Sequence, residues 1–150
     1  MNKKSFTLVE LLVVIAIISI LAAGLLVGLG KARVKARDAR RIADLRNVQS
    51  ALEVYYAQNG AYPSSTSWSD LETALKNAGI ISRLPRDPLE GHTQYDYTDC
   101  NNQQSYILYA KLEDSKNCPL NYSAPTTTNC SDTKISCDCK KDGNLCITIR

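Results

Sequence analysis

Residues 3 to 30 read KKSFTLVELLVVIAIISILAAGLLVGLG, and this stretch decides how the chain is built. From Leu11 to Gly30 it contains no charged residue. A helix of this length, rising about 1.5 Å per residue, spans roughly 30 Å, which is the thickness of the hydrocarbon layer of a membrane. We therefore expect a helix that crosses the membrane once.

Glu10 stands directly before this apolar run and a few residues after Lys3 and Lys4. A charged side chain at the centre of a membrane-spanning helix costs about 2.5 to 3.5 kcal/mol, and less near the interface. A carboxylate in this place therefore indicates a dedicated positive partner.

A secretory signal peptide is the main alternative, with Lys3 and Lys4 as its basic end and Ala22-Ala23-Gly24 as a cleavage site. Three features oppose it. The apolar run is longer than the usual core of about 7 to 15 residues, Glu10 interrupts its start, and helix-forming sequence follows it instead of a turn. We therefore expect the helix to continue.

The segment from Lys31 to Ala57 contains neither proline nor glycine. Its apolar residues recur three or four positions apart, which is the spacing of one helix face, at Ile42, Leu45, Val48, Leu52 and Tyr55. The sequence therefore predicts one long helix, with an apolar half over residues 6–30 and an amphipathic half over residues 31–58. Its apolar face needs a domain to cover it, and residues 59–150 are the candidate.

Within that domain, Asn59-Gly60 ends the long helix, and Ser69-Asp70-Leu71-Glu72 fits a capping box for a short helix that Gly79 closes. A proline-fixed turn follows at residues 84–88. Tyrosines and apolar residues predict strands at 94–98, 105–113 and 145–149. The eight tyrosines are interpreted as core and strand residues. The fold class is α+β, with a long helix packed on a small antiparallel sheet.

The net charge of +3 hides an asymmetry along the chain. Residues 31–46 are strongly basic, whereas residues 47–150 carry a net negative charge. The basic side chains could meet the acidic surface of another copy, anionic lipid or nucleic acid. We interpret them chiefly as a helix face that is solvated or buried between copies. They are Lys31, Arg33, Lys35, Arg37, Arg40, Arg41 and Arg46.

All six cysteines lie in the last third of the chain. An even number in a loop-rich tail indicates disulfides made in an oxidising compartment. Six cysteines can pair in about fifteen ways, which the sequence alone cannot separate. The pair favoured here is Cys100 with Cys118. Zinc is the weaker interpretation, because Cys137 and Cys139 lack the usual spacing and His92 lies far away. The six are Cys100, Cys118, Cys130, Cys137, Cys139 and Cys146.

Basic residues near the two ends of the apolar run favour a cytoplasmic domain by the positive-inside tendency. The cysteines favour the opposite side, and we give them more weight. The expected orientation is a single crossing of the cytoplasmic membrane with the N-terminus in the cytoplasm.

Residues 3–18 resemble the N-terminal processing and methylation motif of type IV pilins and type II secretion pseudopilins. Residues 55–63, with Leu84-Pro85-Arg86-Asp87-Pro88 and the tyrosines after it, are similar to the branch of major pseudopilins. Beyond Cys100 nothing specific is similar.

The resemblance implies a leader of residues 1–5 that a prepilin peptidase removes by cutting between Ser5 and Phe6. Phe6 would then be N-methylated, and Glu10 would be the assembly acid. The family usually has glycine before the cut, whereas this chain has Ser5. The new amine and Glu10 lie one helical turn apart, so they can pair within a chain or set the stagger between chains.

The function implied is a structural subunit of a type IV pilus or pilus-like filament, polymerised from the membrane to the cell surface. Its partners would be copies of itself, the prepilin peptidase, a platform protein and an assembly ATPase. The alternatives are a pseudopilin of a type II secretion system and a minor pilin that binds DNA or surfaces at a fibre tip.

Catalysis finds no support in the sequence, since His92 is isolated and no phosphate loop or nucleophile motif follows a strand. Calcium-binding acids follow the Asp-Pro turn in some major pseudopilins. Here Asp96, Asp99 and Asn101 lie near that place without a ligand pattern, so no cofactor or metal is predicted.

Overall fold

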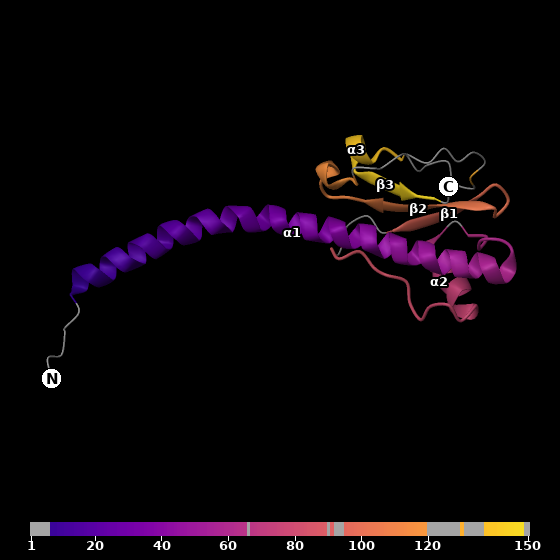
Figure 1. Cartoon of the computed structure of the whole chain (residues 1–150), viewed down its shortest axis with the longest axis horizontal. Helices are drawn as coiled ribbons and strands as arrows, with labels where there is room; N and C mark the ends of the chain where they lie inside the picture. The colour runs from indigo at the N-terminus through magenta and orange to yellow at the C-terminus, as the bar shows by residue number, and fades with distance from the viewer. Residues whose placement is uncertain are drawn as a thin grey trace. The chain divides into compact units, whose positions relative to one another are not determined.

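The computed structural model describes the backbone of residues 7–65, 67–89, 91, 95–119, 130 and 137–148, and the side chains of these residues except 24–28. It has two compact units, residues 1–34 and residues 35–150, which we describe separately. Along the chain the elements are α1 (Leu8–Asn59), α2 (Trp68–Asn77), β1 (Asp96–Cys100), β2 (Ser105–Lys111), the 3-10 helix η1 (Ser115–Asn117), α3 (Cys139–Asp142) and β3 (Asn144–Ile147) (Figure 1).

The long helix expected from the sequence is confirmed as α1. Gly60 ends it in a left-handed conformation, with a φ of 72°. The Gly60 N–H donates a hydrogen bond to the carbonyl oxygen of Tyr56 at 2.8 Å, which satisfies one of the last carbonyls of the helix.

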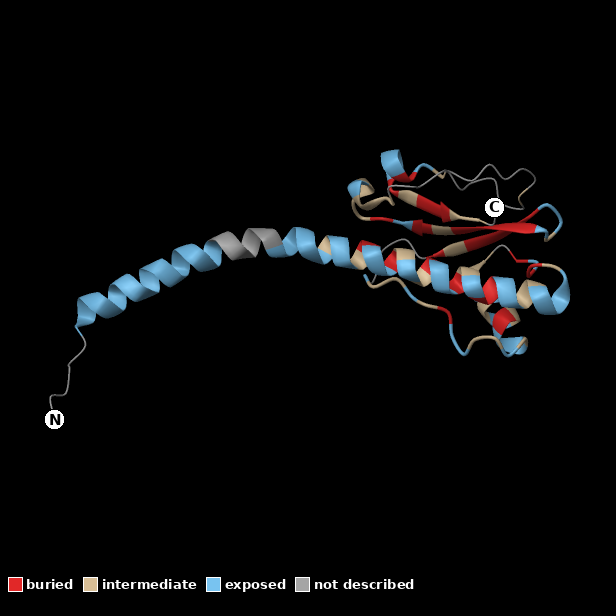
Figure 2. Ribbon diagram, viewed as in Figure 1, coloured by how far each residue is buried: buried red, intermediate tan, exposed pale blue. Residues whose placement is uncertain are grey.

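The apolar face of α1 in the second unit is also confirmed. Leu45, Val48 and Leu52 are buried, and Ile42 and Tyr55 pack partly buried beside them. These residues join the inner face of the sheet and the short helix α2 in one core. In Figure 2 the buried residues appear as red segments that recur along this part of α1 and on the strands.

The helix α2 begins two residues earlier than the predicted capping box. Ser67 is its N-cap, and the Ser67 hydroxyl accepts a hydrogen bond from the Asp70 N–H at 3.2 Å. The predicted N-cap, Ser69, therefore lies inside the helix. Leu71 and Leu75 are buried, and Gly79 closes the helix with a φ of 70°, as expected.

The sheet is antiparallel, in the order β1-β2-β3. Tyr97 pairs with Leu108, and Leu108 pairs with Ile147, so these three lie on the face that packs toward α1. The predicted strands overlap the observed ones, but their ends differ. Tyr95 precedes β1, which continues to Cys100, two residues beyond the predicted end, and β2 stops at Lys111. The third strand, β3, begins at Asn144, one residue before the predicted start, and stops at Ile147. The tyrosine interpretation holds for Tyr62, Tyr95, Tyr97 and Tyr106, which are buried.

On the opposite face of the sheet, the described residues form a small cluster rich in cystine. Cys100, Ile107 and Cys146 form a small buried cluster there, with Cys130 and Cys137 packed against it. The disulfides are Cys100–Cys130, Cys118–Cys139 and Cys137–Cys146.

The favoured pairing of Cys100 with Cys118 is therefore wrong. Cys100 lies at the end of β1 and pairs in a β-bridge with Cys130, whereas Cys118 follows η1 and faces α3. Disulfides of this kind stabilise a small domain whose core cannot order the chain alone.

Gly143 shows how closely the end of α3 packs on the end of β2. It has a φ of 73°, and a Cβ atom added to it would lie 2.9 Å from the carbonyl oxygen of Leu112. The Leu112 N–H also donates to the Gly143 carbonyl oxygen at 2.8 Å. Only glycine fits this position.

We predict that Gly143→Ala lowers the free energy of unfolding by about 2 to 4 kcal/mol, because it adds backbone strain and a collision with Leu112. Gly79→Ala is the matched control, since Gly79 has a φ of 70° but no atom within 4 Å of the added Cβ. That variant should lose about 1 to 2 kcal/mol. Equal losses by chemical denaturation would contradict the packing argument.

Candidate assembly site

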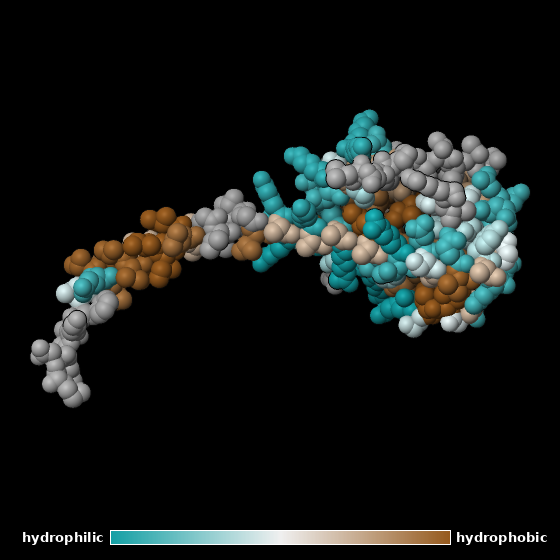
Figure 3. All heavy atoms as spheres, viewed as in Figure 1, coloured by the Kyte–Doolittle hydropathy of each residue, from teal (hydrophilic) through white to brown (hydrophobic). Residues whose placement is uncertain are grey.

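The large apolar side chains that the structure describes in the first half of α1 are exposed. Leu8 is 79% exposed and Ile20 is 74% exposed, and the residues between them are also uncovered. Figure 3 shows this apolar surface on the part of α1 nearest the N-terminus. An uncovered apolar surface of this kind indicates contact with lipid or with other protein chains. In the described part of the chain, no helix has both the length and the unbroken apolar character of a bilayer span.

Glu10 lies in the first turn of α1, where its carboxylate is bound by Thr7. The Thr7 N–H and hydroxyl donate to Glu10 Oε2 at 2.9 and 2.7 Å. In return, the Glu10 N–H donates to the Thr7 hydroxyl at 3.3 Å. This reciprocal capping box fixes the start of the helix and holds the carboxylate in the first turn of α1.

The other predicted processing residues, Ser5 and Phe6, lie outside the described residues, as do Lys3, Lys4 and His92. The roles given to Ser5, Phe6 and Glu10 therefore stay predictions. In the described residues, no group of three or more His, Cys, Asp or Glu side chains is placed to hold a metal ion.

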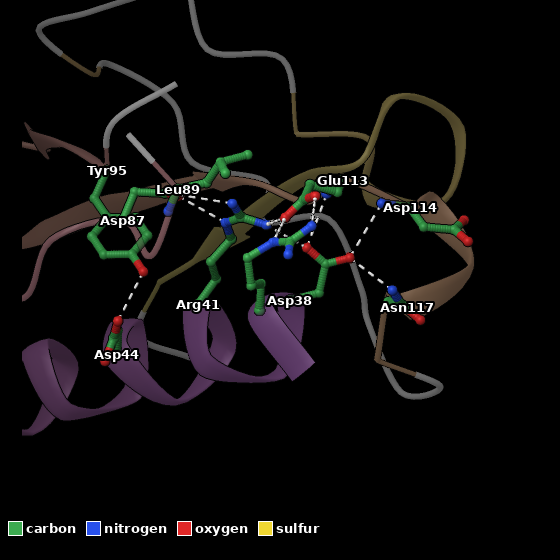
Figure 4. A network of polar contacts seen from close by, with 10 residues as sticks. Asp38, Arg41, Asp44, Asp87, Leu89, Tyr95, Glu113, Asp114 and Asn117 are labelled. Carbon is green, nitrogen blue, oxygen red and sulfur yellow. Dashed lines mark hydrogen bonds and ion pairs between the residues drawn. The ribbon is translucent and has the colours of Figure 1, made fainter. Parts of the chain in front are cut away.

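A buried ionic network connects separate segments of the second unit to one another. The sequence did not lead us to predict it. Arg41 is 0% exposed and contacts carboxylates from three separate segments. Its Nη1 donates to Asp38 and to Glu113 at 2.7 Å each, and its Nε and Nη2 bind the two oxygens of Asp87 at 2.7 and 2.9 Å (Figure 4).

Asp38 is the second buried charge of this network. Besides Arg41, it accepts hydrogen bonds from the N–H groups of Glu113 and Asp114 at 2.9 and 3.2 Å. The Asn117 side-chain amide donates to it at 2.7 Å. Through the Asp38 carboxylate, α1 thereby binds the segment that follows β2. These contacts use most of the hydrogen-bonding capacity of that carboxylate.

The network corrects the interpretation of the basic helix face. Arg41 is buried within its own domain, and Arg37 donates from Nε and Nη2 to Glu113 at 2.7 and 2.5 Å. Arg41 is therefore not solvated, and Arg37, whose side chain is 28% exposed, is paired within its own domain. The sequence signal was the spacing of Asp38 and Arg41, which extends the buried positions of α1 one further turn before Leu45.

Burial alone would lower the pKa of Arg41, but hydrogen bonds to Asp87, Glu113 and Asp38 outweigh it and raise the pKa. The guanidinium therefore stays charged. A similar arrangement fixes Tyr95, whose hydroxyl donates to Asp44 at 2.8 Å and whose pKa is raised by burial and by that carboxylate.

We predict that Glu113 makes stability sensitive to acid. Hydrogen bonds from Arg37 and Arg41 outweigh partial burial and lower the pKa of Glu113 to about 2. In the unfolded chain a glutamate protonates near pH 4.3, at about its reference pKa. The stabilisation is therefore present above about pH 4.3 and is lost as the pH falls toward 2.

Denaturation at stepped pH should show that the free energy of unfolding falls between about pH 4.3 and pH 2. Glu113→Gln should make this pH dependence smaller. Asp142→Asn, at an exposed position of α3, is the charge-matched control. A slope that is the same in Glu113→Gln and in the unaltered protein would contradict the assignment.

Comparison with known proteins matches residues 1–26 to the prokaryotic N-terminal methylation motif. The chain is 32% identical to the type II secretion system core protein G of Vibrio cholerae over 105 residues, which cover 63% of this chain and 70% of the relative. It is 30% identical to core protein G of Aeromonas hydrophila over 97 residues, covering 58% and 68%.

A third relative is the type IV wide pilus major component PilA4 of Thermus thermophilus, 47% identical over 81 residues, which cover 54% of this chain and 57% of the relative. No solved structure matches significantly. The methylation motif, the long helix with its uncovered apolar half, the small antiparallel sheet and these relatives agree with one another. The chain belongs to the family of type IV pilins and type II secretion pseudopilins.

Proposed function

We propose that Glu10 and the amine of processed Phe6 drive the assembly of this chain into a filament, in which it is a structural subunit and not an enzyme. The structural role follows from the family, whose members are anchored in the membrane, processed by a prepilin peptidase and assembled with copies of themselves. The capping box that holds Glu10 at the start of α1 supports the finer assignment, because it keeps the acid at the N-terminal end.

The charge balance of the N-terminus gives the physical reason. Before processing, Lys3, Lys4 and the terminal amine hold the chain at the cytoplasmic face, since several cations are costly to move through hydrocarbon. Cleavage after Ser5 removes both lysines and leaves one amine and one carboxylate. These two charges can neutralise each other between neighbouring chains, so the helix can leave the membrane at low cost.

We also propose a single crossing by residues 11–30, with the N-terminus in the cytoplasm. A platform protein and an ATPase in the cytoplasm would complete the assembly machinery. The exposed apolar half of α1 supports the crossing, and the three disulfides support an oxidising compartment for the domain.

Immunolabelled fibres sheared from cells test the function. We expect antibodies against the domain to decorate fibres, and we expect no fibres from a host that lacks the prepilin peptidase. Decorated fibres in such a host would contradict the proposal.

A second candidate, a short filament of a type II secretion system, is favoured by the core protein G relatives. Loss of a secreted protein on deletion of the chain, without long surface fibres, would support it. The tip-binding alternative requires DNA binding by the domain, and its test is a salt-sensitive gel shift.

A further inference from the structure

The cations of α1 fall into two sets that differ in their partners. Arg37 and Arg41 are bound by carboxylates of the domain, and Arg40 lies 3.8 Å from Asp44. By contrast, Lys31, Arg33 and Lys35 are exposed, and these three form no ion pair within the described part of the chain. Arg46, farther along α1, is also exposed and forms no ion pair in that part of the chain, so three of these four unneutralised cations follow the apolar run directly.

Their depth relative to the apolar run is that of a lipid headgroup. At about 1.5 Å per residue, Lys31 to Lys35 lie roughly 1.5 to 7.5 Å beyond Gly30. Each headgroup layer is about 5 to 7.5 Å thick, because a bilayer of about 40 to 45 Å has a hydrocarbon core of about 30 Å. Arg37 and Arg41 lie farther along α1, beyond about 10 Å.

The three side chains also surround the helix instead of lining one face. Lys31 and Lys35 are one turn apart and share a face, whereas Arg33 points to the other side. Lipids surround an inserted helix on all sides, while a partner protein would contact one side. Long Lys and Arg side chains reach phosphate groups readily from this depth.

We propose that Lys31, Arg33 and Lys35 bind the phosphates of anionic phospholipids in the outer leaflet and thereby fix the depth of α1 before assembly. This inference rests on the proposed membrane insertion. The positive-inside tendency disfavours basic residues on the outer side of the membrane. Binding to anionic headgroups would compensate for placing these three cations on that side. Each cation near an anionic surface contributes a factor of about five in association.

The test uses the full chain reconstituted in phosphatidylcholine vesicles with trace spin-labelled phosphatidylglycerol or spin-labelled phosphatidylcholine. Electron paramagnetic resonance measures the fraction of each label that the protein immobilises. We expect the unaltered chain to prefer phosphatidylglycerol, and we expect K31Q/R33Q/K35Q to reduce that preference at least two-fold. Salt should have a similar effect, since it screens the attraction.

The matched control is K116Q/K140Q/K141Q, which removes the same charge from exposed lysines of the domain. Its lipid preference should stay that of the unaltered chain. An unchanged lipid preference in K31Q/R33Q/K35Q, or an equal loss of preference in the control, would overturn this inference. Either result would leave the proposed function intact. Immobilisation of neither lipid would remove the membrane anchor, and with it the proposed function.

Discussion

Cells that carry Glu10→Ala should retain the protein in the membrane but make no fibres. The apolar half of α1 is unchanged in this variant, so anchoring persists. The amine of Phe6, however, would enter the filament without a neutralising charge. At about 3 kcal/mol for each unpaired charge in an apolar setting, subunit association weakens roughly 100-fold. Membrane fractionation and electron microscopy of sheared fibres measure the two effects.

Thr7→Ala separates the assembly role of Glu10 from its role at the helix start. It removes the hydroxyl that binds Glu10 Oε2 at 2.7 Å but keeps the carboxylate. We expect this variant to form fibres, with a helix start weakened by about 1 kcal/mol. Normal fibres from Glu10→Ala would refute the assembly role. If Thr7→Ala and Glu10→Ala lost fibres to the same extent, the capping box, and not a charge pair between chains, would control assembly.

Arg41→Ala should destabilise the domain by about 3 to 5 kcal/mol, because it leaves Asp38 charged, buried and without its ionic partner. The loop that contains Asp87 would also lose its two hydrogen bonds to α1. Chemical denaturation measures the loss, and the pH slope attributed to Glu113 should become smaller in the same variant.

Arg40→Ala is the control for this prediction. Its neighbour Asp44 lies 3.8 Å away, and the Arg40 side chain is 63% exposed, so this pair should contribute at most about 1 kcal/mol. If the two variants were equally stable, the buried network would not be what joins α1 to the domain.

The elements governed by local periodicity could be predicted from the sequence. The apolar spacing from Ile42 to Tyr55 identified the buried face of α1, and Asn59-Gly60 identified its end. The α+β class and the antiparallel sheet followed from the same kind of pattern. Strand ends and the N-cap of α2 were less accurate, because several neighbouring serines can serve as the cap and pairing decides where a strand stops.

Features that depend on contacts distant in sequence could not be predicted. The partners of Arg41 come from residues 38, 87 and 113, and no local pattern brings these carboxylates together. The same reason explains the wrong pairing of Cys100, since the fold, and not spacing, brings Cys130 beside it. Charged residues on a helix are usually solvated, so the spacing of Asp38 and Arg41 was not enough to predict that Arg41 is buried.

Mass spectrometry of the N-terminal peptide from sheared surface fibres shows whether the assembled chain has been cut and methylated at Phe6. We expect a chain that starts at Phe6 and carries one methyl group on its amine. A chain that retains Met1, or one that starts near Gly24 as after removal of a signal peptide, would contradict this expectation.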